Sequence, residues 1–220
     1  MNDYRIAEVA FTDVDIVLTL ENGDVLATPI TRHIRIEKAT PDERARWVLA
    51  DDGYGLNWPE LWQPHPQGMV SVWDIVQDRL YDEALNRVQQ AGWDVDAVPP
   101  RDRELVALWR LEADVNNGGF LQFFGNWGER NHHTAVAALD VIGAHRTAEI
   151  VRAMHAVIEP YGQTDEVVSL ADLLGLLSEA ERERLEELDE AFWDYPNPLP
   201  RLVVEHYGDS SAEPRPEGRT

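Results

Sequence analysis

The sequence predicts an α+β fold in which a small antiparallel-sheet module precedes a mainly α-helical domain. Residues 5–30 contain β-branched runs of strand length, and Asn22-Gly23 between two of them is a strong hairpin signal. From about residue 70 the apolar side chains instead recur at helical spacing. The 220 residues fit one large domain or two small ones, at roughly 100–200 residues each. We therefore expect a module at 1–75, a helical domain at 76–207 and a disordered tail at 208–220.

The front module is expected to be a meander of about three strands followed by one helix. The strands are predicted over 6–11, 16–20 and 25–30, and a type I′ turn with two positive-φ residues would join the last two. Thr40-Pro41-Asp42-Glu43 has the pattern of a capping box, so a helix should begin there, include Val48 and Leu49, and be ended by Asp51-Asp52-Gly53. The glycines and prolines of 53–68 predict an irregular connection.

The second half is expected to consist of helices separated by prolines and glycines. Ser178 and Glu181 form a second capping-box pattern at the start of the last long helix. Prolines at 196, 198 and 200 should end that helix, and Leu202–Val204 adds a short element. The predicted helices are centred on 72–80, 105–115, 150–158 and 185–192.

Charge excludes several classes of ligand. The chain has 41 acidic and 19 basic residues, a net charge of −22, and one lysine, Lys38. A surface this acidic repels phosphate backbones and anionic lipids, so we expect no direct contact with nucleic acid or membranes. The absence of cysteine, of a signal peptide at the N-terminus and of a long apolar stretch suggests a cytoplasmic protein. The eight tryptophans leave a homodimer open.

No familiar catalytic or metal-binding motif is present. The only group that suggests a metal consists of Glu129, Asn131, His132 and His133, but adjacent helical side chains point about 100° apart and rarely ligate one ion. We interpret this group as a polar loop and helix start after Gly128, and His145 and His155 as non-catalytic residues of one helix. The sequence therefore predicts no enzyme activity, no metal and no cofactor.

The most distinctive segment runs from Asp114 to Asn126. Its two glycines should stop the preceding helix, after which the phenylalanines return to the core, so we interpret it as a helix–break–helix joint. Its amide side chains, if buried, would pair with the interrupted backbone; a small polar pocket is the alternative. The motif residues are Asn116, Asn117, Gly118, Gly119, Phe120, Gln122, Phe123 and Asn126.

This segment also carries a resemblance. With Arg103-Glu104-Leu105 before it and Ile142-Gly143-Ala144 after it, the region from about Leu80 to Tyr207 resembles a family of acidic bacterial proteins described as DNA mimics. The resemblance implies that the protein binds a DNA-binding protein. The front of the chain contains the Asn22-Gly23 hairpin, the segment 39–44 and the segment 56–61 (Leu-Asn-Trp-Pro-Glu-Leu). With these features, the region from Ile6 to about Trp73 resembles a small bacterial domain of unknown function found near toxin–antitoxin-like genes. There the usual aspartate after Trp-Pro-Glu-Leu is replaced by Trp62.

The charge distribution allows the mimic hypothesis to be stated by residue. Residues 1–75 have net charge −7 and residues 76–220 have −15. Five glutamates share one face of the last long helix over roughly 16 Å, about one carboxylate per 4 Å against one phosphate per ~3.4 Å of a DNA strand. They are Glu179, Glu183, Glu186, Glu187 and Glu190. They are the predicted binding surface for a basic DNA-binding protein.

Two alternatives remain at this stage. A charge run on a helix is usually a solvated face, and Arg182 with Glu186 has the spacing of an ordinary ion pair. The protein would then be a regulatory interaction protein of toxin–antitoxin or phage-defence type, acting through its front module. The other alternative is an enzyme that combines the amides at 116, 117, 122 and 126 with His132 or His133.

Overall fold

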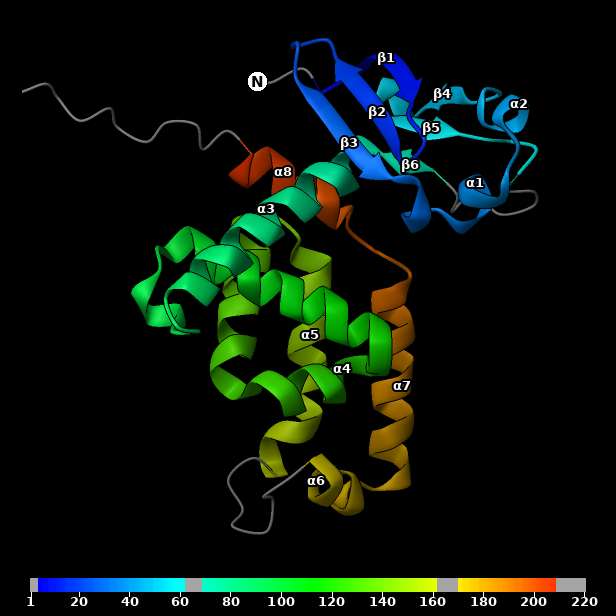
Figure 1. The fold of residues 1–220 in the computed structure, drawn as a ribbon. Helices are drawn as coiled ribbons and strands as arrows, with labels where there is room; N and C mark the ends of the chain where they lie inside the picture. The colour runs from blue at the N-terminus through cyan, green and yellow to red at the C-terminus, as the bar shows by residue number, and fades with distance from the viewer. Residues whose placement is uncertain (1–3, 62–68, 162–169, 209–220) are drawn as a thin grey trace, which may run out of the picture. The chain divides into compact units, whose positions relative to one another are not determined.

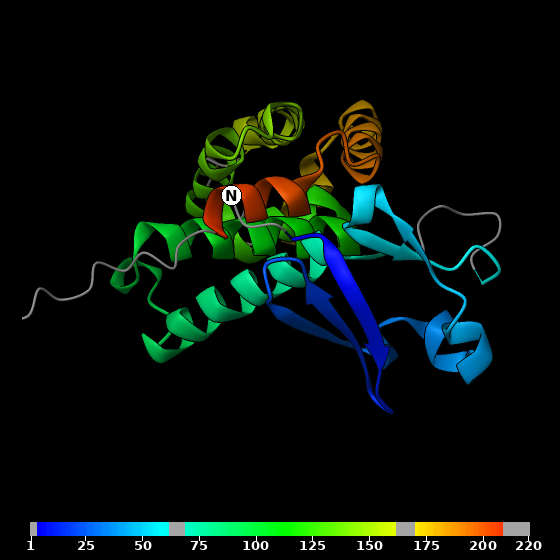
Figure 2. The ribbon, with the colours of Figure 1, turned by 90° about the horizontal axis from the view of Figure 1, so that it is seen from above.

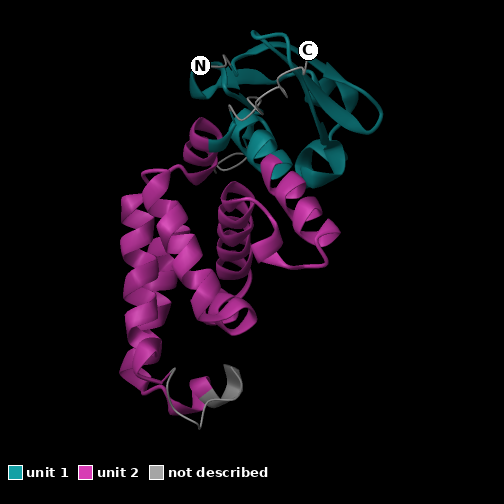
Figure 3. Cartoon of the chain, turned by 90° about the vertical axis from the view of Figure 1, so that its left-hand side faces the viewer, with its two compact units in different colours: residues 1–79, 207–220 teal, residues 80–206 magenta. Residues whose placement is uncertain are grey.

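The computed structural model describes residues 4–61, 69–161 and 170–208. The chain forms two compact units, one of residues 1–79 with Tyr207 and Gly208, the other of residues 80–206 (Figure 3). The boundary falls inside a single helix. The first unit contains two small antiparallel sheets and the second is helical, so the α+β prediction is confirmed. The predicted tail at 208–220 lies outside the described residues except for Gly208.

The first sheet is the predicted meander, with order β1-β2-β3 (Figure 1). Its strands are β1 (Ile6–Phe11), β2 (Asp15–Leu20) and β3 (Val25–Pro29). Ile16, Leu18 and Leu20 alternate along β2 and are all buried, which gives the sheet one apolar face. The turn after β2 is not type I′, because Gly23 has a φ of +89° and Asn22 has no positive φ. The Gly23 N–H instead closes the turn on the Leu20 carbonyl at 2.9 Å.

The second sheet was missed by the sequence prediction. Its order is β4-β5-β6, and its strands are β4 (Val48–Ala50), β5 (Gly55–Asn57) and β6 (Val70–Ser71). Val48 and Leu49, expected in a helix, pair with Asn57 and Leu56. The capping box of Thr40 and Glu43 does form. However, its helix ends at Arg44, since the apolar residues that follow are used for strand pairing.

Short helical elements complete the first unit. Its core includes Leu18, Ile36, Leu56 and the fully buried Trp58, whose indole N–H donates to the Arg44 carbonyl at 2.8 Å. The elements are η1 (Ile30–Arg32), α1 (Ile34–Lys38), α2 (Pro41–Arg44) and η2 (Asp51–Gly53).

In the helical unit, α5 packs against both α4 and α7, and α7 also contacts α4. Figure 2 shows α5 and α7 nearly end-on. Helix α3 begins in the first unit and continues into this one. None of the helices in the described residues is long and apolar enough to cross a membrane. The elements are α3 (Val72–Gln90), η3 (Val95–Ala97), α4 (Pro100–Val141), α5 (His145–Ile158), η4 (Glu159–Tyr161), α6 (Leu170–Leu176), α7 (Glu179–Trp193) and α8 (Leu199–Tyr207).

Helix α4 is interrupted at two places. Its backbone leaves helical geometry at Gly118 and Gly119 and again at Gly128, where φ is +68°. The predicted break after Asn117 is therefore confirmed, and α4 comprises three helical segments at 100–117, 120–127 and 129–141. The backbone also breaks at Gly128 as expected, but Asn131 and His132 are buried on the helix that follows rather than lying in a polar loop.

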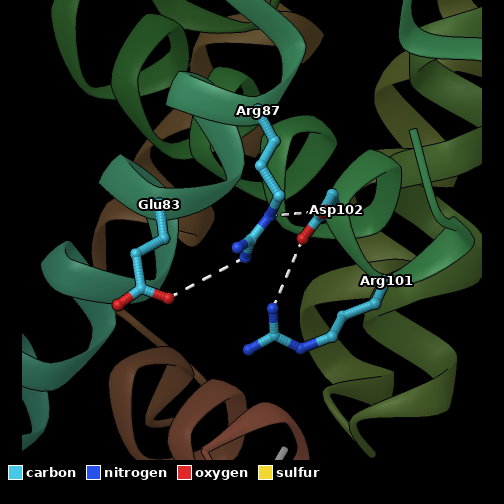
Figure 4. A network of polar contacts seen from close by, with 4 residues as sticks. All are labelled: Glu83, Arg87, Arg101 and Asp102. Atoms are coloured by element: carbon cyan, nitrogen blue, oxygen red, sulfur yellow. Dashed lines mark hydrogen bonds and ion pairs between the residues drawn. The ribbon is translucent and has the colours of Figure 1, made fainter. Parts of the chain in front are cut away.

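A buried carboxylate fixes the start of α4 against α3. Asp102 is 2% exposed and accepts from Arg87 at 2.7 Å and from Arg101 at 3.3 Å (Figure 4). Arg87 also lies 3.8 Å from Glu83, one turn earlier on α3. Because a buried carboxylate needs charged or hydrogen-bonding partners, this network determines how the two helices meet.

Candidate partner-binding face

The predicted acidic side chains all lie on α7 and are all exposed. They are Glu179, Glu183, Glu186, Glu187 and Glu190. We call this set the acidic face. Among the described residues only Glu187 forms an ion pair, with Arg184 at 2.8 Å. The suggested pair of Arg182 with Glu186 does not form, because Arg182 donates to the Leu177 carbonyl. Most of the negative charge of the face is therefore not neutralised by nearby side chains.

The opposite side of α7 anchors it to the helical unit. Leu185, Leu188 and Phe192 are each at most 5% exposed. Ser178 and Glu181 form the predicted capping box at the first turn, which satisfies amide groups that the helix leaves free. The acidic face is thus carried by a helix that is capped at its start and packed along its apolar side.

The motif at the α4 break holds the C-terminal half of α7. Asp189 accepts a hydrogen bond from the Phe120 N–H at 2.9 Å, where the second segment of α4 begins. Trp193 donates its indole N–H to the Val115 carbonyl at 3.0 Å. The interrupted backbone of α4 is therefore satisfied by side chains from α7, and not by the motif's own amides as expected. Burial raises the pKa of Asp189, the Phe120 N–H lowers it, and Glu186 raises it.

Gly119 allows this close approach. Its φ is +79°, a region that favours glycine, and a Cβ built there would lie 2.4 Å from Asp189 Oδ2. A side chain at position 119 would thus be strained and would displace the Asp189 carboxylate that accepts from the Phe120 N–H. Phe120 and Phe123 return to the core as predicted, both 0% exposed.

The motif's amides bind side chains instead of backbone. Gln122 and Asn126 each donate to the Asp114 carboxylate at 3.0 Å, and Trp127 donates to it at 2.6 Å. Asn116 accepts from the Tyr195 hydroxyl at 3.1 Å, beyond the end of α7. Asn116, Asn117, Gly118 and Asn126 are exposed. Three of the motif's amides, those of Asn116, Gln122 and Asn126, thus take part in a joint, with Asp114 and Tyr195 as their partners.

Three histidines, His132, His133 and His155, form a cluster of their own. The His132 and His155 rings stack with centroids 4.1 Å apart, and Glu129 lies 2.9 Å from His155 Nε2 and 3.0 Å from His133 Nε2. Burial, followed by the charges of His155 and His133, lowers the pKa of His132 to about 4. Within the described residues, no group of three or more His, Cys, Asp or Glu side chains is placed to hold a metal ion.

Sequence reasoning missed the residues that position the acidic face. Asp189 looks like one more acid in a charged run, yet positions 185, 188, 189 and 192 share the helical spacing of the buried side. That spacing was the available signal. Trp193 is the last residue of α7 and Tyr195 follows it. Both side chains are exposed, so periodicity gave no indication of their role.

Comparison with known proteins assigns both parts of the chain. Residues 6–61 match a family described as a protein of unknown function (DUF2442). Residues 96–208, just over half of the chain, match the family described as DMP19-like protein, a family of DNA mimics. No curated protein and no solved structure gives a significant match. Both resemblances drawn from the sequence are found again, with the second beginning at 96 rather than near Leu80, and the chain belongs to the DMP19-like protein family.

Proposed function

We propose that the protein imitates the charge of DNA with its acidic face and binds a basic DNA-binding protein, thereby blocking or regulating access of that protein to DNA. The observation that carries the proposal is the exposure of all five glutamates on one anchored helix, where Glu187 alone has an ion-pair partner in the described part of the chain. Membership of a family of DNA mimics supports it. The protein acts in this proposal by binding and not by catalysis.

The geometry of the carboxylates suits a surface that normally contacts phosphates. Glu179 and Glu190 span roughly 16 Å at ~1.5 Å per residue, about the length of five phosphates along one strand. Because α7 is packed and capped, the charges are held in place before binding, which lowers the entropic cost of association. Complementary potentials also accelerate encounter with a basic partner and make it sensitive to salt.

The acidic face is tested by charge reversal. The variant Glu183→Lys, Glu186→Lys and Glu187→Lys should lose at least about tenfold in affinity, since like charges across an interface cost several kcal/mol. The matched control reverses Asp82, Glu149 and Glu159, which are also exposed acids of the helical unit and form no ion pair among the described residues. Both variants change the net charge equally.

The partner is first isolated from extract of the native host on the immobilised protein at low salt and eluted with a salt gradient. The purified partner is then titrated with both variants and with duplex DNA. The proposal requires that duplex DNA competes with the protein and that only the reversal on α7 lowers the affinity by about tenfold or more. If both variants bind like the unmodified chain, the acidic face is not the site.

A further inference from the structure

The helical unit contains a cavity of about 450 Å³ that the acidic face does not use. It lies between η3, the first segment of α4 and the third segment of α4. Its wall includes the guanidinium groups of Arg103, Arg110 and Arg130. In a chain of net charge −22 with only 19 basic residues, three arginines around one cavity are a notable concentration of positive charge.

Asp96 already forms ion pairs with the two arginines at the edge of the cavity. Its Oδ1 is hydrogen-bonded to Arg130 and lies 3.5 Å from Arg103. Consistently, the Arg130 hydrogen bond leads the effects that lower the Asp96 pKa. The carboxylate that bridges these two guanidinium groups shows that this wall of the cavity can bind an oxyanion. It also leaves Arg110 as the arginine of the cavity that has no ion pair among the described residues.

Arg110 is half-buried and its guanidinium stacks on the Trp127 ring at 3.8 Å. Burial lowers its pKa, and the charge of Asp114 acts in the opposite direction. Asp114 does not pair with it, because its carboxylate accepts from Gln122, Asn126 and Trp127. A partly desolvated cation with no anion in contact is costly unless a ligand supplies the anion.

A second donor lies next to Arg110. The Asn131 side-chain oxygen accepts from Arg110 at 2.9 Å, and Asn131 is 8% exposed. Its Nδ2 and the Nε of Arg110 are both buried with no hydrogen-bond partner in the described part of the chain. Buried N–H donors are almost always paired in folded proteins. Arg110 and Asn131 thus both line the cavity, and each carries a buried N–H donor that lacks an acceptor within the described residues.

We propose that this cavity binds a small organic anion, with its carboxylate or phosphate group held by Arg110 and Asn131. The apolar part of the ligand packs on Val95, Pro100 and Ala137, which also line the cavity. Glu104, another wall residue, lies about 9 Å from Arg110 at ~1.5 Å rise per residue along α4, so its negative charge favours the Arg110 end for the anionic group.

The ligand class is tested on the full chain with benzoate, phenyl phosphate and the neutral benzamide. Binding is followed by the ¹H–¹⁵N NMR signals of the Trp127 indole N–H and the Arg110 Nε–H. We expect both anions to shift these signals with saturation and a dissociation constant on the order of 1 mM, and benzamide to leave them unchanged. The relative affinities of benzoate and phenyl phosphate show which anionic group the site prefers.

Two variants locate the site. Asn131→Asp places a carboxylate of the same shape beside Arg110, so the chain should stay folded while anion binding falls at least tenfold. Arg110→Gln should have the same effect on binding. Its matched control is Arg146→Gln, which removes an exposed charge of α5 outside the cavity and should bind as the unmodified chain does.

The proposal is overturned if benzamide binds as well as benzoate, because the cavity would then take apolar groups without regard to charge. It is also overturned if neither anion perturbs the two signals, or if Asn131→Asp binds benzoate with undiminished affinity. None of these results depends on the acidic face of α7, so they leave the proposed function to its own test.

Discussion

At the scale of single residues, Gly119 shows how the motif works. Gly119→Ala should lower the free energy of unfolding by about 2–3 kcal/mol, because it combines a strained positive φ with a contact of 2.4 Å to Asp189. Gly143→Ala is the control, since Gly143 has a φ of +80° but nothing within 4 Å of the added Cβ. Comparing the two variants by urea unfolding separates the effect of backbone strain from the effect of the contact with Asp189. Equal losses would mean that the approach of Asp189 is unimportant.

His132 gives a prediction about pH. Its pKa is lowered to about 4 in the folded chain and is about 6.5 in the unfolded chain, so the unfolded state binds the proton more readily. The contribution of neutral His132 to the free energy of unfolding is fully present above pH ~6.5 and is lost as the pH falls towards 4. It amounts to about 3 kcal/mol at most.

Replacing His132 by Phe should therefore flatten the fall in unfolding free energy between pH 7 and pH 4. The exposed His145→Asn is the control, and both are compared with the unmodified chain by urea unfolding at each pH. The variants are compared with the unmodified chain because Asp74 changes the free energy of unfolding with pH in the direction opposite to His132. Burial, with the charge of Asp78, raises the pKa of Asp74 to about 6. A slope unchanged in His132→Phe would contradict the prediction.

At the scale of elements, α7 depends on its apolar side. Leu188→Ala should cost about 2–4 kcal/mol of stability, since Leu188 is 5% exposed and its removal leaves a cavity against the neighbouring helices. Leu174→Ala on α6 is the control, because Leu174 is 41% exposed and should change stability far less. Thermal unfolding measures both. A similar loss in the two variants would show that α7 is not anchored by this packing.

The elements also show what the sequence could and could not predict. The capping boxes at Thr40 and Ser178 and the break after Asn117 depend on neighbouring residues, so local patterns were sufficient. Val48 and Leu49 became strand residues because they pair with Asn57 and Leu56, a choice that tertiary pairing makes over local propensity. The partners of the α4 break, Asp189 and Trp193, are distant in sequence and therefore could not be predicted.

At the scale of the whole molecule, charge should affect stability as well as binding. With net charge −22, mutual repulsion opposes compaction, so adding salt up to about 0.3 M should raise the melting temperature by screening it. The reversal of Glu183, Glu186 and Glu187 brings the net charge to −16 and should reduce this effect of salt. Thermal melts across a salt series check both. A melting temperature that falls with salt would mean that attractive pairs dominate.

The joint between α4 and α7 finally has a consequence for the order in which the chain is made. Phe120 and Val115 leave the ribosome before their partners, Asp189 and Trp193, which follow 69 and 78 residues later. At a synthesis rate of about 5–20 residues per second, the break in α4 lacks these hydrogen-bond partners for roughly 3–16 s. Until then the acidic helix has no completed support, and a growing chain cannot yet present its charges as a fixed row. Under the proposed function, the chain can therefore bind its basic partner only after α7 has been synthesised and has closed the joint.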